Sequence, residues 1–299
     1  MRRGKCVPGY LKHERRMGYL FVAAPFIQFL LFGLLPVGFS LYASFTNWSV
    51  LTRIRWVGLR NYAELFADPN FWKALANTLY YFAGVPIGMA FALLLALLMN
   101  RGRRTERLFR VVYYLPAVSS VIAISILWQW ILNTDYGILN WCLSFFGIKG
   151  PNWLGDPLYV KPALILMGVW CGLGPMIILF AAALKNIPNE FYEAARIDGA
   201  GPVSIFLRIT LPLLGPVLFY FLVLGFIANM QTFGNIYILA PGGGPGYSAA
   251  SLVYYLWQKG MGNYQMGYAS AVAWILALIT LLVTFVQFRF GSRWSNPND

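Results

Sequence analysis

The residues best suited to chemistry lie in one polar stretch, Glu190 to Pro216, which reads EFYEAARIDGAGPVSIFLRITLPLLGP between two long apolar segments. Pro188 suits the first turn of a helix, where its missing N–H costs nothing. Acidic side chains at Glu190 and Glu193 favour the positive end of that helix. We therefore predict a helix from about Pro188 to Asp198. A patterned polar hairpin in so apolar a chain raises the question of what it contacts.

The helix should end at Gly199, a residue free to take a positive φ after the last turn. A second short helix can then start at Pro202 and lead into the next apolar segment. The pattern predicts a helix–turn–helix that lies along the membrane surface, with Phe191, Ala194 and Ala195 on one face. Small alanine side chains would let the groove of another protein come close. An ordinary solvated connector is the alternative interpretation.

The sequence lacks the motifs that nucleotide binding or metal binding would need. The chain has no G-x-x-x-x-G-K-[ST] loop to hold nucleotide phosphates. Its one histidine, His13, lies in a basic tail, and its three cysteines form no C-x-x-C pair. We therefore predict no catalytic residue, no metal site and no cofactor bound by this chain. If it pumps a solute, another polypeptide hydrolyses the nucleotide.

The composition is that of a chain dissolved in lipid. It is 59% hydrophobic and 11% charged, whereas a soluble domain carries about 25% charged residues. A helix needs about 20 apolar residues to cross the hydrocarbon core. Six segments qualify, and inside them only Arg110 is charged. Proton- and sodium-driven carriers usually keep ionisable groups at membrane depth, so an ion-coupled carrier is disfavoured. The six predicted spans are Tyr19–Phe45, Leu75–Met99, Leu108–Ile131, Pro162–Leu184, Leu213–Leu239 and Tyr264–Phe288.

Basic residues set the predicted orientation. Six spans place both termini on one side, and that side, with the polar hairpin, holds 16 of the 23 Lys and Arg residues. By the positive-inside rule the hairpin and both termini are cytoplasmic. We predict a basic tail over 1–18, a membrane domain over 19–288 and a C-terminal tail over 289–299. The net charge of +13 then reports orientation and contact with anionic lipid, and no nucleic-acid partner is expected.

The polar hairpin also carries a recognisable motif. EAARIDGAGPVSIFLRITLP resembles the EAA motif of the membrane-spanning subunits of binding-protein-dependent ABC importers. The segments WVGLRNYAELFADPNFWKALANT, YYLPAVSSVIAISILWQWILNTDYGILN, NWLGDP and GGGPGYSAASLVYYLW are similar to the carbohydrate-uptake branch, in particular the first permease of maltose and glycerol-3-phosphate systems. The positions that match the motif are Glu193, Ala194, Ala195, Gly199, Ala200, Ile209, Leu211 and Pro212.

The resemblance implies an all-α, six-helix permease with the type I ABC importer fold, in the plasma (inner) membrane of a bacterium or archaeon. It also implies a second homologous permease, two ATPase subunits that use ATP, and an extracytoplasmic solute-binding protein as partners. The hairpin over 186–210 would then couple this chain to an ATPase. Glu193 would make a polar contact and Gly199 would set the turn. The residues of the predicted ATPase contact are Phe191, Glu193, Ala194, Ala195, Asp198 and Gly199.

The implied function is ATP-driven import of a sugar or oligosaccharide, with this chain forming half of the path. One alternative is import of another solute, such as glycerol-3-phosphate, a polyamine or an amino acid. A second alternative, from a different class, is a sensor or assembly subunit that binds an ATPase without moving solute.

Two further segments are candidates for contact with solute or partner. The loop APGGGPGYS, Ala240 to Ser248, is predicted on the outer side, where Gly243, Gly244 and Pro245 could shape a gate or contact the binding protein; a plain turn is the alternative.

In the fifth span, sequence spacing puts Phe226, Asn229, Met230, Phe233 and Tyr237 on one helical face, flanked by Gln231 and Asn235. Relatives are expected to bind solute on this helix, since aromatic rings and amides suit sugars. Interhelical packing is the alternative for these residues. The predicted path residues are Asn229, Gln231, Phe233, Asn235 and Tyr237.

Overall fold

The protein is helical throughout the part that the structure describes. The computed structural model describes residues 9–49, 53–99 and 105–295, and within these ranges it holds no β-strand beyond one isolated bridge, Thr46 to Trp56. The α-helices are α1 Gly9–Phe29, α2 Leu35–Ser44, α3 Arg60–Ala67, α4 Pro69–Tyr81, α5 Gly84–Met99, α6 Thr105–Val118, α7 Val121–Ile131, α8 Ile138–Ser144, α9 Val160–Lys185, α10 Asn189–Ile197, α11 Pro202–Ile205, α12 Leu211–Leu213, α13 Gly215–Met230, α14 Gly234–Leu239, α15 Leu252–Trp257 and α16 Met266–Ser295. Short π-helical turns (Leu30–Leu34, Phe206–Thr210, Gln258–Gly262) and 3₁₀ turns (Pro241–Gly243, Pro245–Tyr247) complete them.

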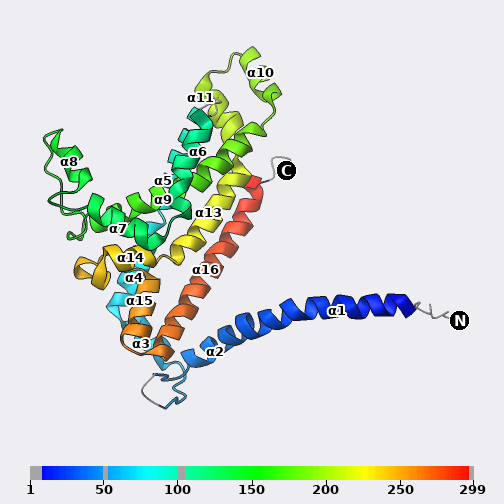
Figure 1. The fold of residues 1–299 in the computed structure, drawn as a ribbon, viewed down its shortest axis with the longest axis vertical. Helices are drawn as coiled ribbons and strands as arrows, with labels where there is room; N and C mark the ends of the chain where they lie inside the picture. Colours follow the sequence, from blue (N-terminus) through cyan, green and yellow to red (C-terminus); the bar gives the residue numbers. More distant parts are fainter. Residues whose placement is uncertain (1–8, 50–52, 100–104, 296–299) are drawn as a thin grey trace.

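Four helical stretches are long and apolar enough to cross a membrane, and two bent pairs raise the number to six if each pair is one span. This agrees with the predicted all-α, six-span fold. The polar hairpin, α10 and α11, lies at the same end of the body as the C-terminus, whereas α3 and α15 lie at the opposite end (Figure 1). The four single stretches are Arg16–Ser44, Pro69–Met99, Val160–Lys185 and Met266–Gly291.

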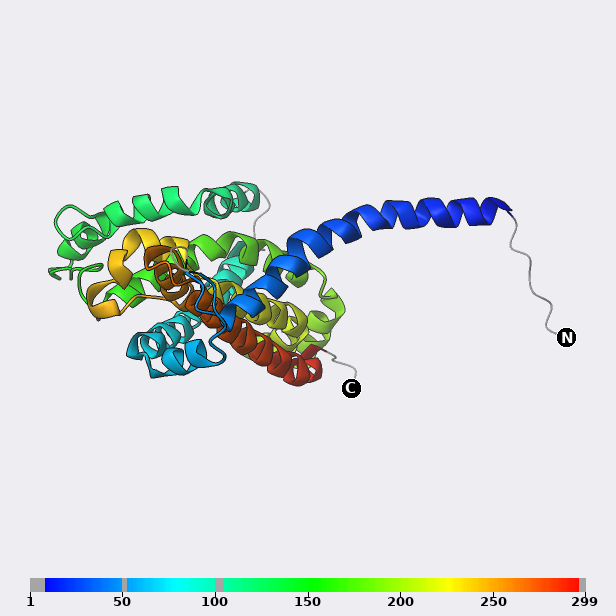
Figure 2. The ribbon, with the colours of Figure 1, turned by 90° about the horizontal axis from the view of Figure 1, so that it is seen from below.

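The first span stands away from the body. In Figures 1 and 2 the joined helices α1 and α2 leave the helix bundle near α3 and extend into open space. None of the most apolar window of Arg16–Ser44 is buried in this chain. Helix α1 begins already at Gly9, inside the segment predicted as a tail, and residues 1–8 lie outside the described part. Because this span is apolar and its most apolar window is not buried within the chain, lipid or another chain must cover it.

The third predicted span is not one straight helix. It bends by 119° between α6 and α7, at Ser119 and Ser120. Pro116 supplies no backbone donor inside α6, and the Ser119 hydroxyl donates to the carbonyl of Leu115 at 2.8 Å, in competition with the backbone ladder. Ser120 is then extended, with φ −61° and ψ 131°. The prediction of an unbroken span here was wrong for this reason.

The fifth predicted span, Leu213–Leu239, is also broken, at both ends of α13. A bend of 62° separates Pro202–Leu213 from α13. The Gly215–Pro216 pair starts a new helix there, because proline fits the first turn and disrupts a helix interior. Helix α13 ends at Met230, and the chain turns before α14. The predicted single helix was therefore wrong at its two ends.

The C-terminal helix continues beyond its predicted end. Helix α16 runs to Ser295, so most of the predicted tail over 289–299 is helical, and residues 296–299 lie outside the described part. Its start, predicted at Tyr264, falls at Met266 because Tyr264 has a φ of +58°, which no helix accepts.

The core sits where α5 packs along α9 and α13. Phe180 and Ile177 of α9 are fully buried there with Leu214. Helix α6 crosses α9 so closely that a β-carbon on Gly174 would lie 2.4 Å from the carbonyl oxygen of Tyr113. Glycine at that crossing lets the two backbones touch. The same bundle holds the hairpin at one end and the glycine-rich loop, Ala240–Ser248, near the other.

Candidate functional site

The polar hairpin folds as its sequence predicts. Helix α10 spans Asn189–Ile197, and Gly199 follows it with a φ of +74°. The N–H of Ala200 donates to the carbonyl of Ala195 at 2.9 Å, and the N–H of Gly199 donates to that of Arg196 at 3.1 Å. These two bonds form a Schellman cap, which requires a left-handed residue at the position of Gly199. The structure therefore confirms the predicted turn.

Helix α10 presents an exposed apolar face at the tip of the molecule. Phe191 is 51% exposed and Ala194 is exposed as predicted, whereas Ala195 is half-buried on the inner side. Ile197, which the sequence reasoning missed, is 87% exposed. It lies three residues beyond Ala194, so its helical spacing from the predicted face was the signal that could have identified it. Val203 of α11, 71% exposed, extends the face.

The inner side of α10 ties the hairpin to the bundle. Tyr192 packs against the core around Leu214, and its hydroxyl lies 3.3 Å from the Thr210 hydroxyl. Glu193 and Asp198 are exposed, and the structure gives neither carboxylate an ion pair within the described residues. The hairpin is thus fixed on one side and offers apolar and acidic groups on the other. Such a surface can bind a second protein.

A cavity of about 240 Å³ lies between α4, α5, α9 and α13. Five of its lining residues are glycines from three different helices, which leaves room where side chains would otherwise pack. Among its polar lining residues are Asn229, Thr232 and Asn235. No residue that lines this cavity is charged. The glycines are Gly84 and Gly88 of α5, Gly168 and Gly172 of α9, and Gly225 of α13.

The predicted single face of the fifth span is wrong, because the helix stops inside it. Gln231 closes α13, and Phe233 is non-helical with φ −143° and ψ −59°. The carbonyl of Thr232 accepts a hydrogen bond from the Ser251 hydroxyl at 2.6 Å instead of continuing the helix. Asn229 and Asn235 still reach the same cavity, although they lie on different elements. Gln231 lies apart from them, beside α16.

Phe233 and Tyr237 join an aromatic cluster rather than the cavity wall. Their ring centroids lie 5.5 Å apart, and Trp257 lies 5.8 Å from Phe233 and 4.9 Å from Tyr237. Tyr237 is 43% exposed, so the cluster reaches the surface near the glycine-rich loop. Phe226 and Met230 are buried and serve packing.

The two asparagines of the cavity differ in their contacts. The Asn229 amide donates to the carbonyl of Thr78 on α4 at 2.8 Å, which joins α13 to α4. The Asn235 side-chain oxygen accepts from the N–H of Ile236 at 3.0 Å, and the residue lines the cavity. Asn229 therefore makes the interhelical contact that packing predicts and lines the cavity as well.

The glycine-rich loop depends on glycine for its shape. Gly242, Gly243, Gly244 and Gly246 all have positive φ values, from +61° to +84°. A β-carbon on Gly243 would lie 2.9 Å from the ring of Tyr247. The residues predicted for a gate thus form two tight turns rather than an open loop.

Side chains of α4 donate hydrogen bonds to the backbone at the end of this loop and just after it. The Asn77 amide donates to the carbonyls of Tyr247 at 3.2 Å and Ala250 at 3.1 Å. The Tyr81 hydroxyl donates to the carbonyl of Ala249 at 2.8 Å. One helix thereby satisfies the Tyr247 carbonyl in the loop and the two carbonyls just after it, which fixes the end of the loop against α4.

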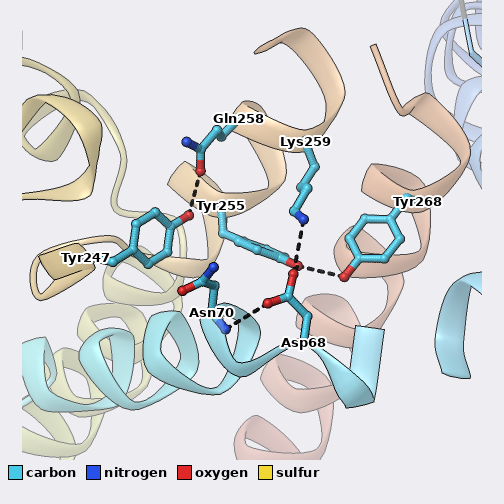
Figure 3. A network of polar contacts seen from close by, with 7 residues as sticks. All are labelled: Asp68, Asn70, Tyr247, Tyr255, Gln258, Lys259 and Tyr268. Atoms are coloured by element: carbon cyan, nitrogen blue, oxygen red, sulfur yellow. Dashed lines mark hydrogen bonds and ion pairs between the residues drawn. The ribbon is translucent and has the colours of Figure 1, made fainter. Parts of the chain in front are cut away.

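A part-buried polar network joins the start of α4 to α15, to the π-helical turn after it and to α16 (Figure 3). Oδ2 of Asp68, the N-cap of α4, accepts from the Tyr255 hydroxyl at 2.7 Å and from Nζ of Lys259 at 3.0 Å. Oδ1 accepts from the N–H of Asn70 at 2.8 Å. The Tyr268 hydroxyl lies 2.6 Å from that of Tyr255, so three elements meet at one carboxylate.

The environment of Asp68 favours its charged form. Burial opposes ionisation, but hydrogen bonds from Tyr255, the Asn70 backbone and Lys259, together with the charge of Lys259, hold the pKa of the carboxyl below its ordinary value of 3.8. Nζ of Lys259 also lies 5.2 Å from the ring centroids of both Tyr255 and Tyr268. The carboxylate is therefore ionised at neutral pH. Sequence reasoning did not identify this network.

Over residues 9–49, 53–99 and 105–295, no group of three His, Cys, Asp or Glu side chains comes together that could hold a metal ion.

The comparisons with known proteins agree with this architecture. The family of binding-protein-dependent transport system inner membrane components matches residues 84–296. The chain belongs to this family. It is a permease, the membrane component of an ABC transporter, and not an enzyme.

Relatives resemble the permease over nearly its whole length. A probable ABC transporter permease of Bacillus subtilis, YesP, is 38% identical over 95% of this chain and 93% of its own. The lactose transport system permease LacF of Rhizobium radiobacter is 35% identical over 91% and 92%. The trehalose/maltose permease MalF of Thermococcus litoralis is 32% identical over 93% and 94%.

Solved structures share the fold of the permease. A chain of a bacterial ABC transporter involved in import of the acidic polysaccharide alginate aligns with a TM-score of 0.81, covering 97% of this chain and all of its own, at 24% identity. A second crystal structure, of the alginate transporter in complex with a pentasaccharide-bound periplasmic protein, aligns equally well at 23% identity. The type I permease fold expected from the sequence is thereby confirmed.

Proposed function

We propose that this permease forms half of the path by which a sugar or oligosaccharide, delivered by a binding protein, enters the cell. The observation that carries the proposal is the cavity between α5, α9 and α13, whose glycines make room and whose Asn229 and Asn235 offer amides to hydroxyl groups. Relatives named for lactose, trehalose/maltose and arabinooligosaccharide transport support the same class of solute.

The hairpin of α10 and α11 would transmit the conformational change of the ATPase subunits to this chain. The excess of basic residues on its side of the six spans supports a cytoplasmic position for the hairpin. There its exposed Phe191 and Ile197 would enter a groove of an ATPase subunit, and Glu193 and Asp198 would meet basic residues at the rim. Closure of the ATPases on ATP would then move the bundle between inward- and outward-facing states. One hairpin accounts for one ATPase, so a pair of permeases would engage two.

A second permease would complete the path. The cavity is open on one side, and the exposed first span offers a long apolar surface that a membrane partner can cover. On the opposite side of the membrane, the glycine-rich loop and Tyr237 lie where a solute-binding protein would dock. A complex of the related alginate transporter with its periplasmic protein supports such a partner.

Uptake in living cells tests the proposal. Deleting the gene should abolish ATP-dependent uptake of one radiolabelled saccharide from a panel that includes neutral disaccharides, arabinooligosaccharides, glycerol-3-phosphate, a polyamine and an amino acid. Wild-type permease should restore it. Loss of a non-sugar instead would overturn the sugar assignment. Unchanged uptake of every solute in the deletion strain, together with co-purification of an ATPase with the wild-type permease, would favour the sensor or assembly alternative.

A further inference from the structure

One helix holds the whole glycine-rich region. Near its C-terminal end, α4 bonds one carbonyl of the loop and the two that follow it through Asn77 and Tyr81. The Thr78 hydroxyl accepts from the N–H of Leu252, the first residue of α15, at 2.9 Å. Ser251, which caps α15, donates to the carbonyl of Thr232 at 2.6 Å. The loop and the start of α15 are thus fixed to α4 through buried hydrogen bonds.

The other end of α15 is fixed to the N-terminal end of α4 by one carboxylate. Asp68 accepts from Tyr255 and from Lys259, which follows α15 in the π-helical turn (Figure 3). The Asp68 and Lys259 side chains are only 19% and 23% exposed, so water screens the pair little. Gln258, beside Lys259, accepts from the Tyr247 hydroxyl at 2.8 Å and links the network back to the loop.

This arrangement has a mechanical consequence. Helix α4 leads directly into α5, whose Gly84 and Gly88 line the cavity. Any motion of α15 away from α4 would break the contacts of Asp68 at one end and of Thr78 at the other, and would separate the Asp68 carboxylate from the Lys259 ammonium. Such unpaired charges are costly. We therefore expect the loop and α15 to move together with α4 and not relative to it.

We propose that Asp68 is a positioning residue for transport, which clamps α15 and the glycine-rich loop to α4 so that all three move as one body when the cavity opens. The proposal rests on the proposed transport function. It differs from a stabilising role, because loss of the clamp should leave the folded complex intact and disturb the movement of the loop.

The chain offers variants that isolate the clamp. Asp68→Asn keeps the N-cap of α4, since asparagine caps as well as aspartate, and removes the charge. Lys259→Gln removes the partner charge, and Lys259→Arg retains it. Asp156→Asn is a matched control, because Asp156 also caps a backbone N–H, that of Leu158 at 2.8 Å, and no Lys or Arg partner is found for it.

Ser248 provides a reporter inside the loop. Its hydroxyl oxygen is buried and has no hydrogen-bond partner, so Ser248→Cys exchanges similar atoms without losing a bond. In a background with the three native cysteines replaced, the purified complex with ATPases, second permease and binding protein is treated with a maleimide. Labelling of Cys at this position then measures how often the loop leaves α4. Uptake in proteoliposomes, per complex, is measured in parallel.

Removing a hydrogen bond to a charged group changes an equilibrium by about tenfold or more, so Asp68→Asn and Lys259→Gln should raise the labelling rate by about that factor. Uptake should fall while the amount of complex stays normal, and Lys259→Arg should recover both readouts. Asp156→Asn should match wild type.

Wild-type labelling in Asp68→Asn would overturn the clamp. So would a fall in the amount of complex with unchanged labelling and uptake per complex, because that is the signature of a purely stabilising residue. A wild-type complex that moves no solute would instead refute the proposed function, and the labelling rates would still decide whether Asp68 fixes the loop.

Discussion

Two glycines of the hairpin allow its geometry to be tested with a minimal change. Gly199 has a φ of +74° and Gly201 a φ of −72°, and a β-carbon added at either would meet no atom within 4 Å. Both are exposed and lie two residues apart. Alanine at each position therefore adds the same methyl group to the same surface, and only the backbone conformation distinguishes the two variants.

The expected cost follows from that difference. An L-residue in the left-handed region costs about 1–2 kcal/mol, so Gly199→Ala should reduce the population of the native hairpin by up to about 5- to 30-fold. Gly201→Ala should change stability by no more than about 0.5 kcal/mol. Gly199→Asn should fall between the two, because asparagine enters the left-handed region more readily than alanine.

Titration of the ATPase subunit against purified permease measures the effect. Binding needs the native hairpin, so the apparent Kd rises as the fraction of native hairpin falls. Gly199→Ala should weaken ATPase binding and solute uptake by up to the factor above, at an unchanged level of permease in the membrane. Equal affinities and uptake for Gly199→Ala and Gly201→Ala would refute the assignment of this turn as the ATPase contact.

Three further predictions use other parts of the structure. Ile197→Ser should weaken ATPase binding by more than about 1 kcal/mol without lowering membrane levels, because Ile197 is 87% exposed in this chain; unchanged affinity in the same titration would contradict its role. Asn229→Ala should cost about 0.6 kcal/mol of packing, too little to lose the complex, yet shift the preference among transported sugars; loss of protein with an unshifted preference would indicate packing alone. The pKa of Asp68 is lowered on folding, so its stabilising contribution is complete above about pH 4 and is lost as the pH falls through the lower folded-state value; thermal unfolding of wild type and Asp68→Asn should converge below that range, and a gap independent of pH would contradict the ion pair.

The hairpin could be predicted because its signals are local. Proline at the start, acidic residues in the first turn and Gly199 at the end act through neighbouring backbone atoms, so the sequence and the structure agree within a residue or two. The number of spans was also predictable, since it depends on apolar length. Hydropathy, however, does not tell whether a span is straight or where its helix axis bends. The bend of 119° at Ser119 depends on Pro116 and on a side-chain hydrogen bond, which an average over the window does not register.

The rest of the site could not be predicted because its contacts are long-range. Asp68 and Lys259 lie 191 positions apart, and nothing in the sequence pairs them. The break after Met230 likewise depends on Ser251, which draws the carbonyl of Thr232 away from the helix. Helical spacing therefore put Phe233 and Asn229 on one helical face, whereas Phe233 lies beyond the end of α13.

Reconstitution of transport tests the central claim most directly. The permease, its partner permease and the ATPases are placed in liposomes with ATP inside and the binding protein, loaded with a radiolabelled saccharide, outside. We predict ATP-dependent accumulation of the saccharide in the lumen, which requires the binding protein and is lost with Gly199→Ala far more than with Gly201→Ala. A complete complex that hydrolyses ATP in response to the loaded binding protein and accumulates no saccharide would contradict the account.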